Sequence, residues 1–221
     1  MKPVVVILVL CVCVRICYAE NIPSSANRTQ RTTPLSVSGN DRAHKKSPDG
    51  RYAVFIRKSQ NQAYLTVGDE TEYPGDAILA DQIWLFDTSA GKERLLVADK
   101  IPGKGDITQG LQQGIAFIDD DSLCFSPDGA NLYFISSAWV VSGALHAVNL
   151  RTGRERFVAA ANTVEVVPSG EYAGHLIVQQ HRYFMGNGSY DWYWLIDPQG
   201  REIGPVGETL EQVAVFKSTY R

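Results

Sequence analysis

Residues that could act as nucleophiles, bases or metal ligands are few in this chain of 221 residues, and they match no familiar catalytic spacing. The chain contains no Gly-x-Ser-x-Gly sequence, which places the nucleophilic serine of α/β-hydrolases on a sharp turn. Its four histidines, His44, His146, His175 and His181, form no His-x-x-x-His pair of the kind that zinc-binding helices use. We therefore predict structural or surface histidines, no catalytic residue, no metal and no cofactor.

Two further features carry chemically active groups. The acidic run Asp119–Asp121 offers carboxylate oxygens, which suit Ca²⁺, but the spaced ligands, glycine and distal glutamate of a calcium loop are missing around it. We interpret this run as a solvated turn. Cys124 lies between Leu123 and Phe125, which predicts a buried strand thiol rather than a redox site.

Aromatic residues in three long loops are more informative about function. The predicted partner-binding residues are Tyr64, Tyr73, Trp139, Tyr183, Phe184, Met185 and Tyr190. The first loop also carries four acidic residues, Asp69, Glu70, Glu72 and Asp76. Exposed aromatic side chains beside acids suit a protein partner with a basic, partly apolar surface. The alternative is that these side chains only cover the ends of the sheets.

A repeated turn introduces the elements that position these loops. Ser47–Gly50 and Ser126–Gly129 both read Ser-Pro-Asp-Gly and precede an apolar run, and Val167–Gly170 (Val-Pro-Ser-Gly) is a weaker third copy. Proline presets the backbone of a tight turn, Asp or Ser can bond the neighbouring backbone, and glycine takes the final positive-φ position. Each copy therefore predicts a turn followed by a strand.

A second repeated element lies downstream of each turn, at residues 83–97, 145–158 and 192–203. An apolar strand ends in Asp or Asn, a short turn closes on glycine, and a basic-acidic pair starts the next strand, which is typical of a hairpin. Each unit is thus a four-stranded antiparallel meander of about 40 residues, the size of a β-propeller blade.

The meander also explains why the three aromatic loops are grouped. Loops that join the second and third strands of successive blades project from the same end of a propeller. We therefore expect residues 60–80, 138–143 and 182–191 to converge at that end.

These repeats resemble the WD40-like propeller repeat of the TolB family, which also occurs in the propeller domains of prolyl oligopeptidases and dipeptidyl peptidases. The residues that carry the resemblance are Lys46–Gly50, Phe125–Gly129 and the hairpins closed at Gly91-Lys92 and Gly153-Arg154. The resemblance spans roughly residues 46 to 206. It implies an all-β propeller that serves most often as a binding scaffold, and in TolB a periplasmic one.

The blade count departs from this resemblance. Only three four-stranded antiparallel blades are found within residues 47–221, whereas propellers close with about four to eight. The apolar run Gln212–Phe216 predicts a C-terminal strand that supplies the first strand of the first blade. The alternative closure is a homodimer with six blades.

The N-terminus predicts export. Residues 1–19 combine a basic start at Lys2, an apolar run too short to span a bilayer, and small residues before a cleavage position after Ala19. The alternative is an uncleaved anchor, because Arg15 follows the apolar run. Residues 20–46 are polar and are interpreted as a flexible leader. Removal of residues 1–19 takes away two positive charges from a chain whose formal net charge is already −3, so nucleic acid is excluded as a partner.

Together these observations predict an exported, non-catalytic protein-binding module of propeller type, located in the periplasm or secreted, with no membrane span once the signal is removed. An envelope scaffold and an inhibitor or immunity-type binder both fit. The rival function is a hydrolase or lyase acting in the propeller mouth. Such an enzyme gathers histidine, arginine and carboxylate on one loop face, where the chain offers only the pair His181 and Arg182.

Overall fold

The computed structural model describes residues 41–63, 78–101, 112–186 and 188–220, which all belong to one compact unit, Thr33–Arg221. The other unit, Met1–Thr32, lies outside the described residues, as do the predicted signal peptide and residues 20–40 of the predicted leader.

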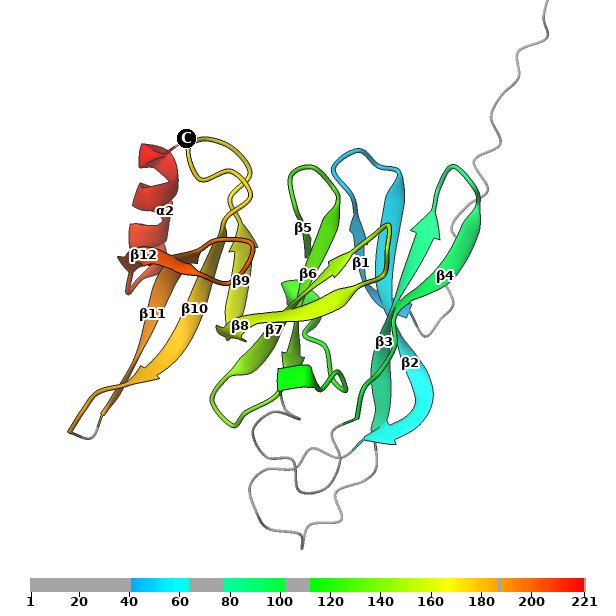
Figure 1. Cartoon of the computed structure of the whole chain (residues 1–221), viewed down its shortest axis with the longest axis horizontal. Coiled ribbons are helices and arrows are strands. Elements are labelled where there is room, and N and C mark those ends of the chain that lie inside the picture. The colour runs from blue at the N-terminus through cyan, green and yellow to red at the C-terminus, as the bar shows by residue number, and fades with distance from the viewer. Residues whose placement is uncertain (1–40, 64–77, 102–111, 187, 221) are drawn as a thin grey trace, which may run out of the picture. The chain divides into compact units, whose positions relative to one another are not determined.

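The described residues form three four-stranded antiparallel sheets (Figure 1). The first sheet comprises β1 (Asp41–Lys46), β2 (Tyr52–Ala63), β3 (Ile78–Asp87) and β4 (Lys92–Val97). The second comprises β5 (Cys124–Phe125), β6 (Asn131–Ser137), β7 (Gly143–Asn149) and β8 (Glu155–Ala161). The third comprises β9 (Thr163–Val166), β10 (Leu176–Tyr183), β11 (Ser189–Ile196) and β12 (Glu202–Gly207). A short 3-10 helix, η1 (Asp120–Ser122), precedes β5, and a helix, α2 (Leu210–Thr219), follows β12.

The strand order within each sheet follows the chain, which confirms the predicted meander. The Ser-Pro-Asp-Gly turns join the first two strands of the first and second sheets. In both turns the serine hydroxyl donates to the aspartate two residues later, at 2.6 Å for Ser47 and Asp49 and 2.5 Å for Ser126 and Asp128. The closing glycines have φ of 69° and 67°, a region that L-residues with side chains rarely adopt. Identical tetrapeptides thus build the same turn twice.

The sheets pack face to face in chain order. Val54, Ile83 and Phe134 belong to one buried cluster that joins the first sheet to the second. Leu145 and Val178 belong to another cluster, which joins the second sheet to the third. Successive blades of a propeller pack in this way, so the fold is the predicted all-β, propeller-like arrangement of three blades.

The outer face of the third sheet is covered by α2. Val213 is buried with Ile177 and Leu195, and Phe216 packs against the same cluster. The prediction of a closing strand at residues 212–216 is therefore wrong, because these residues lie within α2. Thr209 caps the helix, since its hydroxyl accepts from the Gln212 backbone N–H while the Gln212 side chain accepts from the Thr209 N–H.

This helix also bears on the predicted homodimer. A second copy that completed a six-bladed ring would have to place its first sheet against the outer face of the third sheet. Val213 and Phe216 already fill that face, so this form of the dimer conflicts with the packing of α2.

The leader prediction is wrong for its last six residues, because Asp41–Lys46 forms β1 and pairs antiparallel with β2. The strand was missed because its residues are polar. It is held by ion pairs instead: Arg57 binds Asp41 at 2.6 Å, and Arg42 contacts both Asp81 and Asp120. Within the described residues, no helix has the length and apolar character needed to cross a membrane.

Candidate functional site

The most exposed aromatic and apolar residues of the third sheet lie at the tip of the β10–β11 hairpin, which projects from the same end of the sheets as the β6–β7 loop (Figure 1). The two strands pair without a break from Leu176 with Ile196 to Tyr183 with Ser189. Their inner ends are buried in the core, which anchors the hairpin. At the tip, Tyr183 is 70% exposed, Phe184 58% and Met185 106%. The hairpin therefore holds a protruding apolar tip on a rigid base.

Ring contacts order this tip. Phe184 stacks on Tyr190, with ring centroids 4.8 Å apart and planes at 26°, and Tyr190 meets Trp192 edge to face at 6.1 Å. Tyr190 and Trp192 share one sheet face because side chains alternate along a strand. Gly188 lies so close that a Cβ there would be 3.1 Å from the Phe184 ring. We call the four residues Phe184, Met185, Tyr190 and Trp192 the hairpin aromatic ladder.

The charged residues along the hairpin are paired. Arg182 binds Glu202 at 2.5 Å, and its guanidinium lies 3.6 Å from the centroid of the Trp194 ring. His181 Nδ1 lies 2.9 Å from an Asp191 carboxylate oxygen. The rival function needs His181 and Arg182 to act on a substrate, but both are already engaged with neighbouring side chains. The positive charge of Arg182 beside the ladder is therefore balanced by Glu202.

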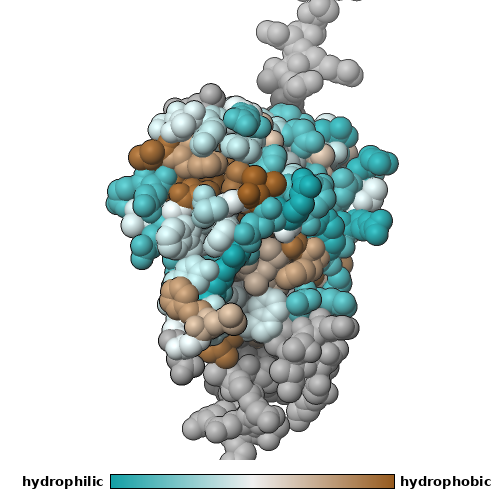
Figure 2. Space-filling view, turned by 60° about the vertical axis from the view of Figure 1, so that its left-hand side comes forward, coloured by the Kyte–Doolittle hydropathy of each residue, from teal (hydrophilic) through white to brown (hydrophobic). Residues whose placement is uncertain are grey.

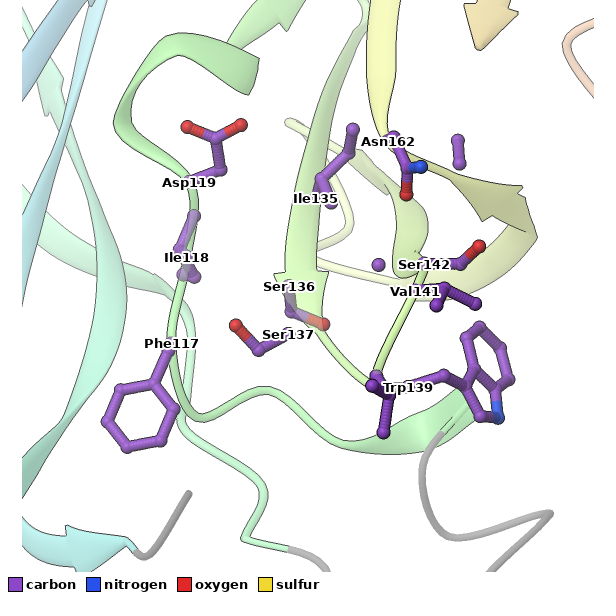
Figure 3. A pocket seen from close by; sticks show the side chains of 13 residues that line it. Phe117, Ile118, Asp119, Ile135, Ser136, Ser137, Trp139, Val141, Ser142 and Asn162 are labelled. Atoms are coloured by element: carbon purple, nitrogen blue, oxygen red, sulfur yellow. The ribbon is translucent and has the colours of Figure 1, made fainter. Parts of the chain in front are cut away.

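Trp139 lies in the β6–β7 loop, at the end of the second sheet. It borders a pocket of about 420 Å³ whose lining includes Phe117 and Val140 (Figure 3). Phe117 and Trp139 stand at opposite sides of this pocket, and Trp139 also packs edge to face on Phe157, 6.3 Å away. Val140 is 77% exposed. This pocket is a second surface feature, separate from the hairpin.

The predicted site residues thus fall into three groups. Tyr183, Phe184, Met185 and Tyr190 lie together on the β10–β11 hairpin. Trp139 contacts Phe157 of its own sheet and has no ring contact with the hairpin. Tyr64 and Tyr73 lie outside the described residues. The β6–β7 loop and the β10–β11 tip lie at the same end of their sheets (Figure 1), without a ring contact between them, and the convergence of all three loops stays a prediction.

A buried polar chain that sequence reasoning missed crosses the second sheet. Ser136 Oγ lies 3.0 Å from His146 Nε2, and His146 Nδ1 lies 2.6 Å from Glu155 Oε1. Glu155 also contacts Lys100, and the Ser136 hydroxyl is 2.8 Å from the Gly114 carbonyl oxygen. Only the strand register brings these residues together, so no local motif signals them.

This chain has the connectivity of a serine nucleophile, a base and an orienting acid. Ser136 and His146, however, are both 0% exposed, and the His146 ring stacks on Phe134 at 5.1 Å. A substrate therefore cannot reach the hydroxyl in this conformation. Burial alone would raise the pKa of Glu155, but hydrogen bonds from His146 and Lys100 outweigh it and hold that pKa below its usual value. The arrangement stabilises a buried carboxylate.

The remaining chemically active groups serve local structure. Asp119 caps η1, because its side chain accepts from the Asp121 backbone N–H at 3.1 Å. In the part of the chain that the structure describes, no cluster of three or more histidine, cysteine or acidic side chains is placed to hold a metal. Burial raises the pKa of Cys124 to about 12, so its thiol is protonated at neutral pH.

Comparisons with known proteins found similarity among solved structures alone. No protein-family model matches the sequence, and no curated protein matches it. Among solved structures, TolB from Acinetobacter baumannii is similar, with a TM-score of 0.46 and 14% identity over 79% of this chain and 34% of that one. Porphyromonas gingivalis dipeptidyl peptidase 4 has a TM-score of 0.45 and 10% identity over 75% of this chain and 24% of that one.

The β-propeller domain of the Trilobed protease from Pyrococcus furiosus is also similar, with a TM-score of 0.42 and 12% identity over 77% of this chain and 42% of that one. The chain spans about a third of the length of TolB and about a quarter of that of the peptidase. The assignment of the fold rests on the order and packing of its own sheets. The protein is thus an all-β, propeller-like chain of three four-stranded antiparallel sheets, similar to TolB and to the propeller domains of peptidases.

Proposed function

We propose that this protein is exported and binds another protein through the hairpin aromatic ladder, without catalysis of its own. The observation that carries the proposal is the exposed but ordered tip, where Phe184 and Met185 project while Phe184 is stacked on Tyr190. Large aromatic and methionine side chains are enriched in protein interfaces, where they fill apolar pockets of the partner.

The order of the tip matters for affinity. A free aromatic side chain loses rotamer entropy when it is immobilised, at a cost of about 0.5–1.5 kcal/mol. The Tyr190 ring already holds Phe184 in place, so most of that cost falls on folding rather than on binding. Glu202 balances the Arg182 charge, and the tip itself is apolar, which favours a partner with an apolar groove.

Export rests on the N-terminal sequence. Residues 1–19 have the three-part pattern of a signal peptide, and the mature chain would then reach the periplasm or the outside of the cell. Removal of those residues leaves a single cysteine, Cys124, so the exported chain forms no internal disulfide and depends on its apolar core.

The proposal can be tested by capture from envelope and secreted fractions of the source cells. The wild type is compared with Phe184→Ala/Met185→Ala and with a matched control, Leu210→Ala/Val215→Ala. The control removes exposed apolar groups of α2, since Leu210 is 68% and Val215 64% exposed. Figure 2, which brings the side of the third sheet forward, shows hydrophobic residues there in separate patches among hydrophilic ones.

We expect one protein to be captured by the wild type and the control but lost with the hairpin variant, while thermal unfolding is the same for all three. Capture that survives in the hairpin variant, or is lost equally in the control, would contradict the proposed binding surface. Export is checked separately, by N-terminal sequencing of the mature protein, which should begin at Glu20.

A further inference from the structure

The arginines of the described chain divide into two groups. Five have a carboxylate partner: Arg42, Arg51, Arg57, Arg182 and Arg201. The other four have none among the described residues, and all of them lie around the β7–β8 turn: Arg94, Arg151, Arg154 and Arg156. In a chain with a formal net charge of −3, a local group of unpaired guanidinium groups is a distinct feature.

Two of these arginines line a pocket. Arg154 and Arg156 border a cavity of about 360 Å³, together with Asn131, Asn149 and Thr152. Both arginine residues are exposed. Arg156 contacts a neutral carbonyl oxygen, that of Pro198, and the Arg154 guanidinium has no hydrogen bond in the described part of the chain.

The walls of the pocket do not neutralise this charge. Asn149 Oδ1 accepts from the Thr152 hydroxyl at 3.1 Å, so these side chains satisfy one another. The neighbouring acids are engaged elsewhere: Glu155 points to His146 and Lys100, and Asp128 accepts from the Ser126 hydroxyl at 2.5 Å and from the Ala130 N–H at 3.0 Å. The pocket therefore presents two positive charges to solvent.

We propose that this pocket binds an acidic, extended segment of a protein, with carboxylates at alternate positions. A guanidinium group forms two parallel hydrogen bonds with a carboxylate. Arg154 continues the β7–β8 ladder, because its carbonyl oxygen accepts from the Asn149 N–H at 3.0 Å, so Arg154 and Arg156 are two residues apart on an extended chain.

The spacing selects the ligand. Positions two apart on an extended chain share a face and lie about 7 Å apart. Alternate residues of an extended acidic peptide have the same backbone separation, so each of two such carboxylates can bind one guanidinium group.

This site is independent of the hairpin aromatic ladder. In an antiparallel meander, the loop between the second and third strands and the turn between the third and fourth strands lie at opposite ends of the sheet. The β10–β11 tip belongs to the first kind and the β7–β8 turn to the second, so either site can fail without the other.

The probe is a fluorescent peptide of alternating glutamate and serine, followed by anisotropy at low and high salt. The variants are Arg154→Gln/Arg156→Gln and Arg154→Lys/Arg156→Lys. The control, Lys46→Gln/Lys92→Gln, removes the same amount of charge from two exposed lysines of the first sheet. All four proteins are first compared by thermal unfolding.

We expect the Gln variant to bind the peptide about tenfold more weakly than the wild type does. The Lys variant should also lose most of the wild-type affinity, and the control should stay within about twofold of the wild type. Equal loss in the control, or no binding by the wild type at about 1 mM peptide, would overturn the proposal. Displacement of the probe by inorganic phosphate as effective as that by unlabelled peptide would overturn it in favour of a phosphate site.

Discussion

The Phe184 ring lies on the Tyr190 ring across the β10–β11 hairpin, with 4.8 Å between centroids and 26° between planes. Tyr190 pairs with Arg182 in the strand register, so the sheet backbone holds Tyr190 in place, whereas Phe184 lies just beyond the paired residues. We expect Tyr190→Ala to reduce partner capture through loss of order at the tip, even though Phe184 and Met185 remain. Ile203→Ala serves as a comparison, because Ile203 is an exposed apolar residue of β12 in the same sheet and lies outside the hairpin. Equal effects of the two substitutions would contradict a role for the stack.

The buried chain through His146 should dominate the stability of the second sheet. His146→Ala removes one hydrogen-bond partner each from the Ser136 hydroxyl and the Glu155 carboxylate and opens a cavity, so we expect a loss of about 2–4 kcal/mol in urea unfolding. His181→Ala, on the exposed hairpin, should cost less than about 1 kcal/mol.

The same chain gives a test of catalysis. Ser136 is 0% exposed, so we expect a fluorophosphonate, which labels activated serines, to leave the native protein unmodified. The Ser136→Ala variant is the control for any labelling that is seen. Modification of the wild type that disappears in Ser136→Ala would revive the hydrolase alternative.

The stability of the fold should fall at acid pH in part through Glu155. Its folded pKa is below the ordinary value of 4.5, so the carboxylate stabilises the fold fully above that value. That contribution disappears as the pH falls through the lowered folded pKa. Urea unfolding from pH 7 to pH 3 should therefore show a smaller loss in Glu155→Gln than in the wild type, from a lower starting stability. Parallel curves would show that Glu155 is not linked to folding.

Helix α2 provides a matched pair of substitutions. Val213 is 4% exposed and Val215 is 64% exposed on the same helix. We expect Val213→Ala to lower the free energy of unfolding by about 1–3 kcal/mol and Val215→Ala to change it by less than about 0.5 kcal/mol.

Deletion of residues 208–221 should expose Ile177 and Leu195 and cause self-association in light scattering. A monomeric deletion variant would contradict the covering role of α2.

The Cys124 thiol should be unreactive in the folded protein. Burial raises its pKa to about 12, so almost no thiolate is present at pH 8. Iodoacetamide should modify Cys124 only in urea concentrations that unfold the chain, as followed by mass spectrometry. Rapid modification under native conditions would show that the β5 strand opens locally.

Several parts of the fold were predictable because their signals are local. Ser47–Gly50 and Ser126–Gly129 place proline, aspartate and glycine where a tight turn needs them, and the strands after them are apolar. The aromatic residues of the third loop were predicted as a group for the same reason, since Phe184 and Tyr190 are close in the sequence and face each other across a short hairpin.

Two sequence-based predictions were wrong: the closing strand at residues 212–216 and the flexible leader at residues 41–46. Residues 212–216 form an apolar run that suits either a strand or a helix, and Thr209 with Gln212 carries the capping signal that favours the helix. Strand β1 has no apolar pattern, because ion pairs such as that between Arg57 and Asp41 hold it in place of a buried face. The helix therefore carries a local signal, whereas β1 depends on charged partners elsewhere in the sequence.

The sequence by itself determined the repeat, its turns and hairpins, and hence three antiparallel meanders, because each of these depends on residues a few positions apart. Only the tertiary structure decided how they are completed and what they bring together. Ser136, His146 and Glu155 meet through the register of three strands, and α2 covers the outer face of the third sheet where the sequence suggested a closing strand. Contacts between distant residues depend on strand register and on the packing of faces, which no local pattern encodes.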